Sequence, residues 1–353
     1  MISRKASLAL SVCLVSSQGL AFRLLSLPRR SLTTRWSWEG DSDLNAVSRR
    51  GGSHSVDRGG RSGRGSRNGR SPAFPARQRS EEFEARRAAS KGFEFLYGHS
   101  SVLNALIANR RSSFLELLVQ DRSNSPSSSP SSTDLGHIIG LAEKASIPVT
   151  YLSKHDLNML SDNRPHQGVI LTAAPVSLSF LSDLAPSETK ERSPVWLALD
   201  EVVDPQNLGA LIRSASFLGA EGVVVCAKNS AAPSPVVSRA SAGALEFAPL
   251  FATRSMPRFL AASAENGWRV VGTTLGEGSI PLRQLEVGLP TILVLGNEGH
   301  GLRPMVQRAC STLVNIDGGP SSNIPGLRGG VDSLNVAVSG GIIIHHLLIQ
   351  PAA

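Results

Sequence analysis

The feature that most restricts the fold is a regular alternation of short apolar segments with longer segments of helical spacing, which begins at residue 195. The short segments, such as 195–202, 222–227 and 291–296, are apolar throughout rather than at every second residue. Such runs are typical of strands in a parallel sheet that is covered on both faces. We therefore predict an α/β domain over 194–350 with a mostly parallel sheet, whose ligands lie at the carboxyl ends of the strands. Its predicted strands are 195–202, 222–227, 248–252, 269–275, 291–296 and 311–316, and its predicted helices are 207–220, 234–247, 256–267 and 333–349.

A second, smaller α/β unit is predicted to precede this domain, over 91–175. Val102, Leu103, Leu106 and Ile107 recur at helical spacing, and the following segment SFLELLVQ alternates like a strand. Further predicted elements are a helix in DLGHIIGLAEKAS, a strand in IPVTYL, another helix, and a strand in GVILTAAP. The composition of 185–194 is that of a linker between the two units.

The N-terminal part of the chain carries a positive charge that the remainder does not share. Residues 1–80 hold 15 Lys and Arg against 4 Asp and Glu, and the other residues hold 21 against 24. Residues 1–38 contain no acidic residue, and this composition predicts a transit peptide to the mitochondrial matrix. A secretory signal is the alternative, with 7–15 as its apolar core. The basic run continues beyond that segment, however, and the three cysteines offer no disulfide framework.

Residues 39–80 are predicted to be a disordered linker rich in Arg, Gly and Ser. Its run RGGRSGRGSRNGR resembles RNA-binding segments, but an unselected linker behind a presequence is the simpler interpretation. No stretch of the chain approaches the roughly 18 apolar residues that are needed to span a bilayer. We therefore expect a soluble body and no membrane partner.

Three loops of the predicted larger domain carry polar residues at strand ends. The first, DEVVDPQNLGALIRSA (200–215), places Asn207 where it can cap the next helix, and Arg213 follows six residues later. Gly209 allows a close approach of a neighbouring element. An ordinary capped helix with a surface arginine explains this loop equally well when it is taken alone.

The second loop, LVLGNEGHGL (293–302), looks like a phosphate-binding turn, because a strand runs into Gly296 and two further glycines. It lacks the Lys-Ser or Lys-Thr pair of a P-loop, and its glycines do not have G-x-G-x-x-G spacing. Glu298 would repel a di- or triphosphate, since phosphate binding at such turns depends on positive potential. The loop therefore suits a positively charged ligand held by backbone groups. The alternative is a tight turn with an incidental glutamate.

The third loop, DSLNVAVSGGIIIHH (332–346), predicts a buried helix capped by Ser333. Asn335 would then be a polar residue in its first turn that requires hydrogen-bond partners. His345 and His346 are adjacent and therefore point in different directions on a helix, and no partner stands at a metal-binding spacing. We predict no metal site.

In combination, NLGALIRSA, LVLGNEGHGL and SLNVAVSGGI resemble the three signature motifs of the SpoU-type (TrmH-like) RNA ribose 2'-O-methyltransferases of the SPOUT class. The resemblance spans about 195–349. Residues 91–175, with YGHSSVLNAL near the start and HQGVIL near the end, resemble the small RNA-binding domain that precedes the catalytic domain in this family. With its leader, the whole chain is similar to the mitochondrial large-subunit rRNA ribose methyltransferases.

The resemblance implies a knotted (trefoil) α/β catalytic domain, an exception to the rule that chains avoid knots, and a homodimer formed through that domain. It implies S-adenosylmethionine as the methyl donor. The implied cofactor-binding residues are Gly296, Ile316 and Leu334, and the implied catalytic residues are Arg213, Asn207, Glu298, Ser333 and Asn335. Because the pKa of arginine lies above about 12, Arg213 is a poor general base. We assign it to binding RNA phosphate and stabilising the developing alkoxide, and we assign no residue as the proton acceptor.

The implied substrate is the ribose of a guanosine in mitochondrial large-subunit rRNA, and the need for a 2'-hydroxyl excludes DNA. The residues after 80 have a slight excess of acids, so RNA binding requires a local basic patch, for which Arg110, Arg111 and Arg239 are candidates. The sequence departs from bacterial relatives in a longer segment after Ile316 and in Asp317, where proline is common.

Other functions are compatible with parts of this pattern. One is a catalytically silent RNA-binding or ribosome-assembly factor on the same fold, and another is a tRNA ribose methyltransferase. A nicotinamide-dependent Rossmann enzyme is disfavoured, because no G-x-G-x-x-G follows the first strand of either unit.

Overall fold

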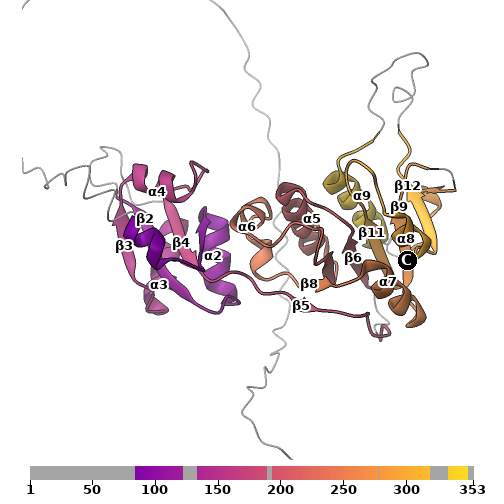
Figure 1. Ribbon diagram of the computed structural model, residues 1–353, viewed down its shortest axis with the longest axis horizontal. Coiled ribbons are helices and arrows are strands. Elements are labelled where there is room, and N and C mark those ends of the chain that lie inside the picture. The colour runs from indigo at the N-terminus through magenta and orange to yellow at the C-terminus, as the bar shows by residue number, and fades with distance from the viewer. Residues whose placement is uncertain (1–83, 122–132, 189–192, 277, 319–332, 349–353) are drawn as a thin grey trace, which may run out of the picture. The chain divides into compact units, whose positions relative to one another are not determined.

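A computed structural model of the protein describes residues 84–121, 133–188, 193–276, 278–318 and 333–348. The predicted transit peptide and the predicted linker over 39–80 lie outside these residues. Within the described residues the chain forms two sheets, both flanked by helices (Figure 1). No helix in this part of the chain is long and apolar enough to cross a membrane.

Eight strands form the larger sheet, in the order β10-β12-β9-β11-β6-β7-β8-β5, and every neighbouring pair runs parallel. The mostly parallel sheet predicted from the apolar runs is therefore confirmed. Its strands are β5 (Ser179–Phe180), β6 (Val195–Leu199), β7 (Gly222–Cys226), β8 (Leu250–Thr253), β9 (Arg269–Thr273), β10 (Ile280–Pro281), β11 (Thr291–Leu295) and β12 (Thr312–Asn315). β5 precedes the predicted start of this domain at 194.

Helices cover both faces of the larger sheet, which explains why its strands are apolar throughout. One face packs against α5 (Pro205–Leu218), α6 (Pro235–Ala240) and α9 (Val336–Leu348), and the other against α7 (Met256–Glu265) and α8 (Pro304–Arg308). Leu197 and Leu199 point to the first face and Ala198 to the second, as the strand period of two requires. α5 and α9 pack against each other above β6 and β11 (Figure 1).

The single helix predicted over 234–247 is wrong. α6 ends at Ala240, and a 3-10 turn, η1 (Ala244–Glu246), follows after Ala242 and Gly243, which both have left-handed backbone conformations. A Cβ atom on Gly243 would lie 2.5 Å from the carbonyl oxygen of Ser100, so the chain approaches another backbone closely here. This tertiary contact overrides the helical pattern of the sequence.

The smaller sheet has four strands in the order β1-β4-β2-β3, with both antiparallel and parallel pairs. Its helices α2 and α3 pack on one face and α4 on the other. This confirms the predicted small α/β unit, although its first strand was not predicted. The elements are β1 (Glu94–Tyr97), α2 (His99–Ala108), β2 (Phe114–Gln120), α3 (Thr133–Lys144), β3 (Val149–Leu152), α4 (Lys154–Leu160) and β4 (Val169–Ala173).

A buried ion pair links the smaller sheet to η1. The guanidinium of Arg111 donates to both carboxylate oxygens of Glu246, over 2.8 and 3.0 Å, and to Glu94 over 2.9 Å. The side chain of Arg111 is 0% exposed and that of Glu246 is 1% exposed. Burial alone would lower the pKa of Arg111, but Glu246 and Glu94 raise it above its usual value. Arg111 is therefore not available to RNA, and its place among the candidates for an RNA-binding patch is corrected.

Candidate active site

The three motif loops meet at the carboxyl edge of the larger sheet and are joined by side-chain hydrogen bonds. Asn207 donates from Nδ2 to Oε1 of Glu298 over 2.7 Å, and Asn335 donates from Nδ2 to Oδ1 of Asn207 over 2.9 Å. These residues come from α5, from the loop after β11 and from the start of α9. Asn207, Glu298 and Asn335 thus form a continuous chain of three side chains, which we call the polar triad.

The local sequence at the start of α5 leaves Asn207 free to join this triad. The helix begins at Pro205, and its N-cap is Asp204, whose carboxylate accepts from the backbone N–H of Gln206 over 3.0 Å. The prediction that Asn207 caps the helix is therefore wrong. The predicted close approach at Gly209 is confirmed, because a Cβ atom there would lie 2.5 Å from the Cβ of Ala240 on α6.

The loop after β11 is a closed turn. Asn297 and Gly301 exchange two backbone hydrogen bonds of 3.0 Å, and Gly301 has a left-handed φ of 70°. A Cβ atom on Gly296 would lie only 2.4 Å from the carbonyl carbon of Gly301, so no other residue fits without opening the turn. Glu298 lies at the tip of this turn and is exposed.

Asn335 has two functions at the start of α9. Its Oδ1 accepts from the backbone N–H groups of Ala337 and Val338, over 2.8 and 3.4 Å, which is the geometry of an N-cap. Asn335 rather than the predicted Ser333 therefore caps the helix, and its need for partners is met by these amides and by Asn207. The expectation of a fully buried helix is also wrong, because the side chains of Val338 and Ile342 are 51% and 40% exposed.

Arg213 and the expected cofactor residues are not members of the triad. Arg213 is exposed on the third turn of α5 and has no hydrogen bond to the triad. Ile316 is half-buried against the core under α5 and α9, and Leu334 is 47% exposed directly before Asn335. Ser333 is exposed. Asp317 forms an ion pair with Arg283, and most of the segment that follows it lies outside the described residues.

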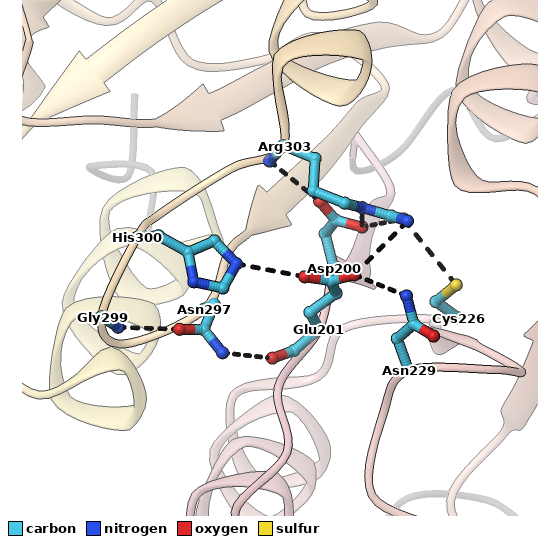
Figure 2. A network of polar contacts seen from close by, with 8 residues as sticks. All are labelled: Asp200, Glu201, Cys226, Asn229, Asn297, Gly299, His300 and Arg303. Atoms are coloured by element: carbon cyan, nitrogen blue, oxygen red, sulfur yellow. Dashed lines mark hydrogen bonds and ion pairs between the residues drawn. The ribbon is translucent and has the colours of Figure 1, made fainter.

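A further polar network lies at the same sheet edge and was not predicted (Figure 2). Glu201, in a left-handed conformation with φ of 64°, accepts from Asn229 over 2.5 Å and contacts the ring of His300 over 3.1 Å. Its backbone carbonyl accepts from Nδ2 of Asn297 over 3.0 Å. The hydrogen bond from Asn229, followed by that from His300, holds the pKa of Glu201 below its usual value. Glu201 thereby anchors the turn that carries Glu298.

Asp200 forms the buried part of this network. Its carboxylate is 0% exposed and accepts from the backbone N–H and the guanidinium of Arg303, the residue before α8. The hydrogen bond that Arg303 donates to Asp200 raises the pKa of Arg303 above its usual value. The sequence does carry a signal for this network, because Asp200 and Glu201 directly follow an apolar strand. Two acids at that position are not explained by apolar packing.

The two histidines near the end of α9 differ in surroundings. His346 lies with Nε2 3.3 Å from the carbonyl oxygen of Leu285, whereas His345 is exposed. Within the described ranges, His, Cys, Asp and Glu side chains do not gather in groups of three or more that could hold a metal ion.

Comparison with known proteins gives matches over both sheets. Residues 194–345 match the SpoU rRNA Methylase family, and residues 95–179 match a family described as RNA 2'-O ribose methyltransferase substrate binding. The chain is 34% identical to the "rRNA methyltransferase 1, mitochondrial" of Homo sapiens, with 73% of each chain covered. It is 33% identical to the protein of that name from Schizosaccharomyces pombe, over 74% of this chain and 92% of the relative.

The namesake from Dictyostelium discoideum is 38% identical over 61% of this chain, but this match spans only 44% of that relative's length. Solved structures share the fold. A crystal structure of an RNA 2'-O ribose methyltransferase has a TM-score of 0.58 at 24% identity, covering 78% of this chain and 96% of that one. An AdoMet-bound rRNA methyltransferase from Sinorhizobium meliloti has a TM-score of 0.57 at 22% identity, covering 75% and 90%. The fold, the three motif loops and these relatives agree, and the chain belongs to the SpoU rRNA methylase family.

Proposed function

We propose that this protein uses S-adenosylmethionine to methylate the ribose 2'-hydroxyl of a guanosine in mitochondrial large-subunit rRNA. The observation that carries the proposal is the polar triad, in which Asn207, Glu298 and Asn335 come from distant segments and bond to one another. The names of the human and fission yeast relatives support an rRNA substrate and a mitochondrial location. The acid-free composition of residues 1–38 supports import into the matrix.

The residues around the triad fit the proposed cofactor. The turn that begins at Gly296 has exposed backbone without a side chain at Gly299, and the neighbouring carboxylate of Glu298 favours a cation over a phosphate. The Oδ1 atom of Asn315, next to Ile316, is buried and has no hydrogen-bond partner among the described residues, so it can accept from a bound donor. We infer that Gly296, Ile316 and Leu334 hold the cofactor. When bound, S-adenosylmethionine supplies an activated methyl group on a sulfonium centre.

The chain's own residues then have to position and activate the ribose hydroxyl. Two backbone amides of α9 orient Asn335, which orients Asn207, which in turn holds one oxygen of Glu298. This order fixes the direction of both amide side chains and the place of the carboxylate, so the site is preorganised. Arg213, on the exposed side of α5, binds the RNA phosphate and stabilises the negative charge that develops on the 2'-oxygen. We also assign to this site Ser333, which is exposed and stands two residues before Asn335.

Methyl transfer to a defined RNA tests the proposed function. The purified full chain is mixed with methyl-labelled S-adenosylmethionine and a transcript of mitochondrial large-subunit rRNA. We expect label at one ribose 2'-oxygen, on a guanosine, and none on a DNA copy of the same sequence, because DNA lacks the accepting hydroxyl. RNA binding without cofactor binding, measured by calorimetry, would instead support a silent assembly factor. Label only on tRNA would indicate a tRNA enzyme.

We further propose that the protein forms a homodimer through the exposed faces of α5 and α9. Phe217 on α5 is 88% exposed, and Val338 and Ile342 on α9 are also exposed. The two helices pack against each other, so these side chains belong to adjacent elements. A cluster of large apolar side chains on adjacent helices is typical of a protein interface. Phe217 lies one helical turn beyond Arg213 on the same side of α5, so the interface would also enclose Arg213.

The substitution Phe217→Glu is expected to weaken this dimer at least about 30-fold, because a buried charge replaces an aromatic anchor. Analytical ultracentrifugation over a range of concentrations measures the change. Phe247→Glu is the matched control, since Phe247 is 55% exposed but lies outside both helices. A monomeric wild-type protein, or equal weakening by both substitutions, would contradict the proposed interface.

A further inference from the structure

A cavity of about 460 Å³ opens at the carboxyl edge of the larger sheet and contains no member of the polar triad. It lies where the loops after β7 and β8 meet the start of α8. Its main lining residues are Lys228, Asn229, Arg254, Met256, Arg303 and Met305. Because the strands are parallel, this cavity and the motif loops share one edge of the sheet.

The charge of the cavity is positive. Three cations and no carboxylate line it. The positive charge of Arg303 is offset by its ion pairs with Asp200 and Glu201. Lys228 is exposed and has no ion-pair partner among the described residues, and Arg254 lies over the ring of Phe180 at 5.3 Å without a described carboxylate partner. Lys228 and Arg254 therefore line the cavity without a described carboxylate partner, and the cavity favours an anionic ligand.

The lining also has an exposed apolar part, which consists of Pro304 and Met305. Both belong to α8, whereas the lining residues Met256 and Val306 are 0% exposed and belong to the core behind the cavity. Thioether side chains adapt to flat rings and make favourable contacts with aromatic edges. A cavity that is lined by cations and by an exposed thioether suits a ligand that joins a phosphate to a planar ring, as a nucleotide does.

Direct hydrogen bonds connect this cavity to the loop that carries Glu298. Asn229, which lines the cavity, donates to Glu201, and Glu201 also contacts His300 in that loop (Figure 2). The backbone of Glu201 holds Asn297 at the base of the same turn. A ligand in the cavity would thus be linked through Asn229 and Glu201 to the turn that carries Glu298, on the side of the sheet edge toward β8.

We propose that this cavity binds a nucleotide of the RNA substrate that neighbours the methylated one. Lys228 and Arg254 bind its phosphate, and Met305 contacts its base. The proposal rests on the proposed RNA 2'-O-methyltransferase function and adds a second subsite to it. An acidic protein segment would satisfy the cations but would leave the exposed thioether of Met305 without a flat ring to contact, and the structure therefore favours RNA.

The test is the double variant Lys228→Gln/Arg254→Gln in the full chain. Its affinity for the rRNA transcript is expected to fall about tenfold or more, because two charge-assisted contacts to phosphate are lost. The slope of log Kd against log salt should decrease by about 1 for each contact. The affinity for S-adenosylmethionine should not change. Arg258→Gln is the matched control, because Arg258 is exposed on α7 and does not line the cavity.

The outcomes separate this proposal from the proposed function. If the wild-type protein methylates the transcript and the double variant keeps its RNA affinity and salt slope, the nucleotide subsite is wrong and the function stands. Equal losses in the double variant and in Arg258→Gln would also overturn the subsite, because they would reflect charge alone. If the wild-type protein transfers no methyl group, the proposed function itself fails, whatever the variants do.

Discussion

The substitution Arg213→Ala is expected to lower the turnover number for methyl transfer by about 10²- to 10³-fold, which is the usual cost of removing a group that stabilises developing negative charge. In the proposed reaction the 2'-oxygen becomes anionic as its proton leaves, and the guanidinium of Arg213, which would also hold the adjacent phosphate, stabilises that state. Arg213 is exposed and bonds to no triad residue, so its removal should leave the fold intact. Single-turnover rates with the rRNA transcript measure the effect.

Two further variants show whether this loss is specific. Arg213→Lys keeps the charge but not the planar fork of donors, and it should recover only part of the rate. Arg258→Ala removes an equally exposed arginine from α7 and should leave the rate unchanged. A rate for Arg213→Ala within about twofold of the wild type would remove Arg213 from the mechanism, and Asn207, Glu298 and Asn335 would then carry the site without it.

Arg111→Ala is expected to lower the free energy of unfolding by about 3–5 kcal/mol, because it leaves a buried carboxylate without its partner. Glu246 is 1% exposed and, among the residues that the structure describes, would keep the hydroxyl of Ser238, at 2.7 Å, as the one side-chain donor to its carboxylate. Glu94 would lose the same cation. Urea unfolding followed by circular dichroism measures the change.

The neighbouring residue supplies the control for this prediction. Arg110 is exposed and donates to the carbonyl oxygens of Ala248 and Leu250, so Arg110→Ala should cost only about 1 kcal/mol. The double variant Arg111→Met/Glu246→Leu removes both buried charges and should be more stable than Arg111→Ala. Equal destabilisation by Arg110→Ala and Arg111→Ala would show that the buried pair does not stabilise the fold.

The fold was predictable because helices cover both faces of the larger sheet, and strands covered on both faces are apolar at every position in the sequence. Runs such as 195–202 and 291–296 are apolar at every position, since alternate residues enter different cores. β5 and β10 were missed because two residues cannot show a period. The break after α6 was missed because it depends on the contact of Gly243 with Ser100, which are far apart in the sequence.

The polar triad was within reach of the sequence, because its members stand in three recognisable motifs. Their mutual hydrogen bonds follow from the parallel sheet, which brings the loops to one edge. The caps were mistaken, since Asp204 and Ser333 offer the same local chemistry as Asn207 and Asn335, and only the three-dimensional arrangement decides between them. Glu201 was missed because its partners Asn229 and His300 lie 28 and 99 residues away.

The position of β11 between β6 and β9 has a consequence for how the chain is made. β6 lies in the middle of the finished sheet, yet one of its two neighbours follows it by about ninety residues. While the chain emerges in sequence order, β6 has an unpaired apolar edge that β11 later closes, and such edges promote aggregation. The triad can be completed only after α9 has emerged. A nascent chain of this protein therefore passes through an inactive stage in which it is prone to aggregation. The edge of β6 is paired when β11 has emerged, and the triad is completed later, when α9 has emerged.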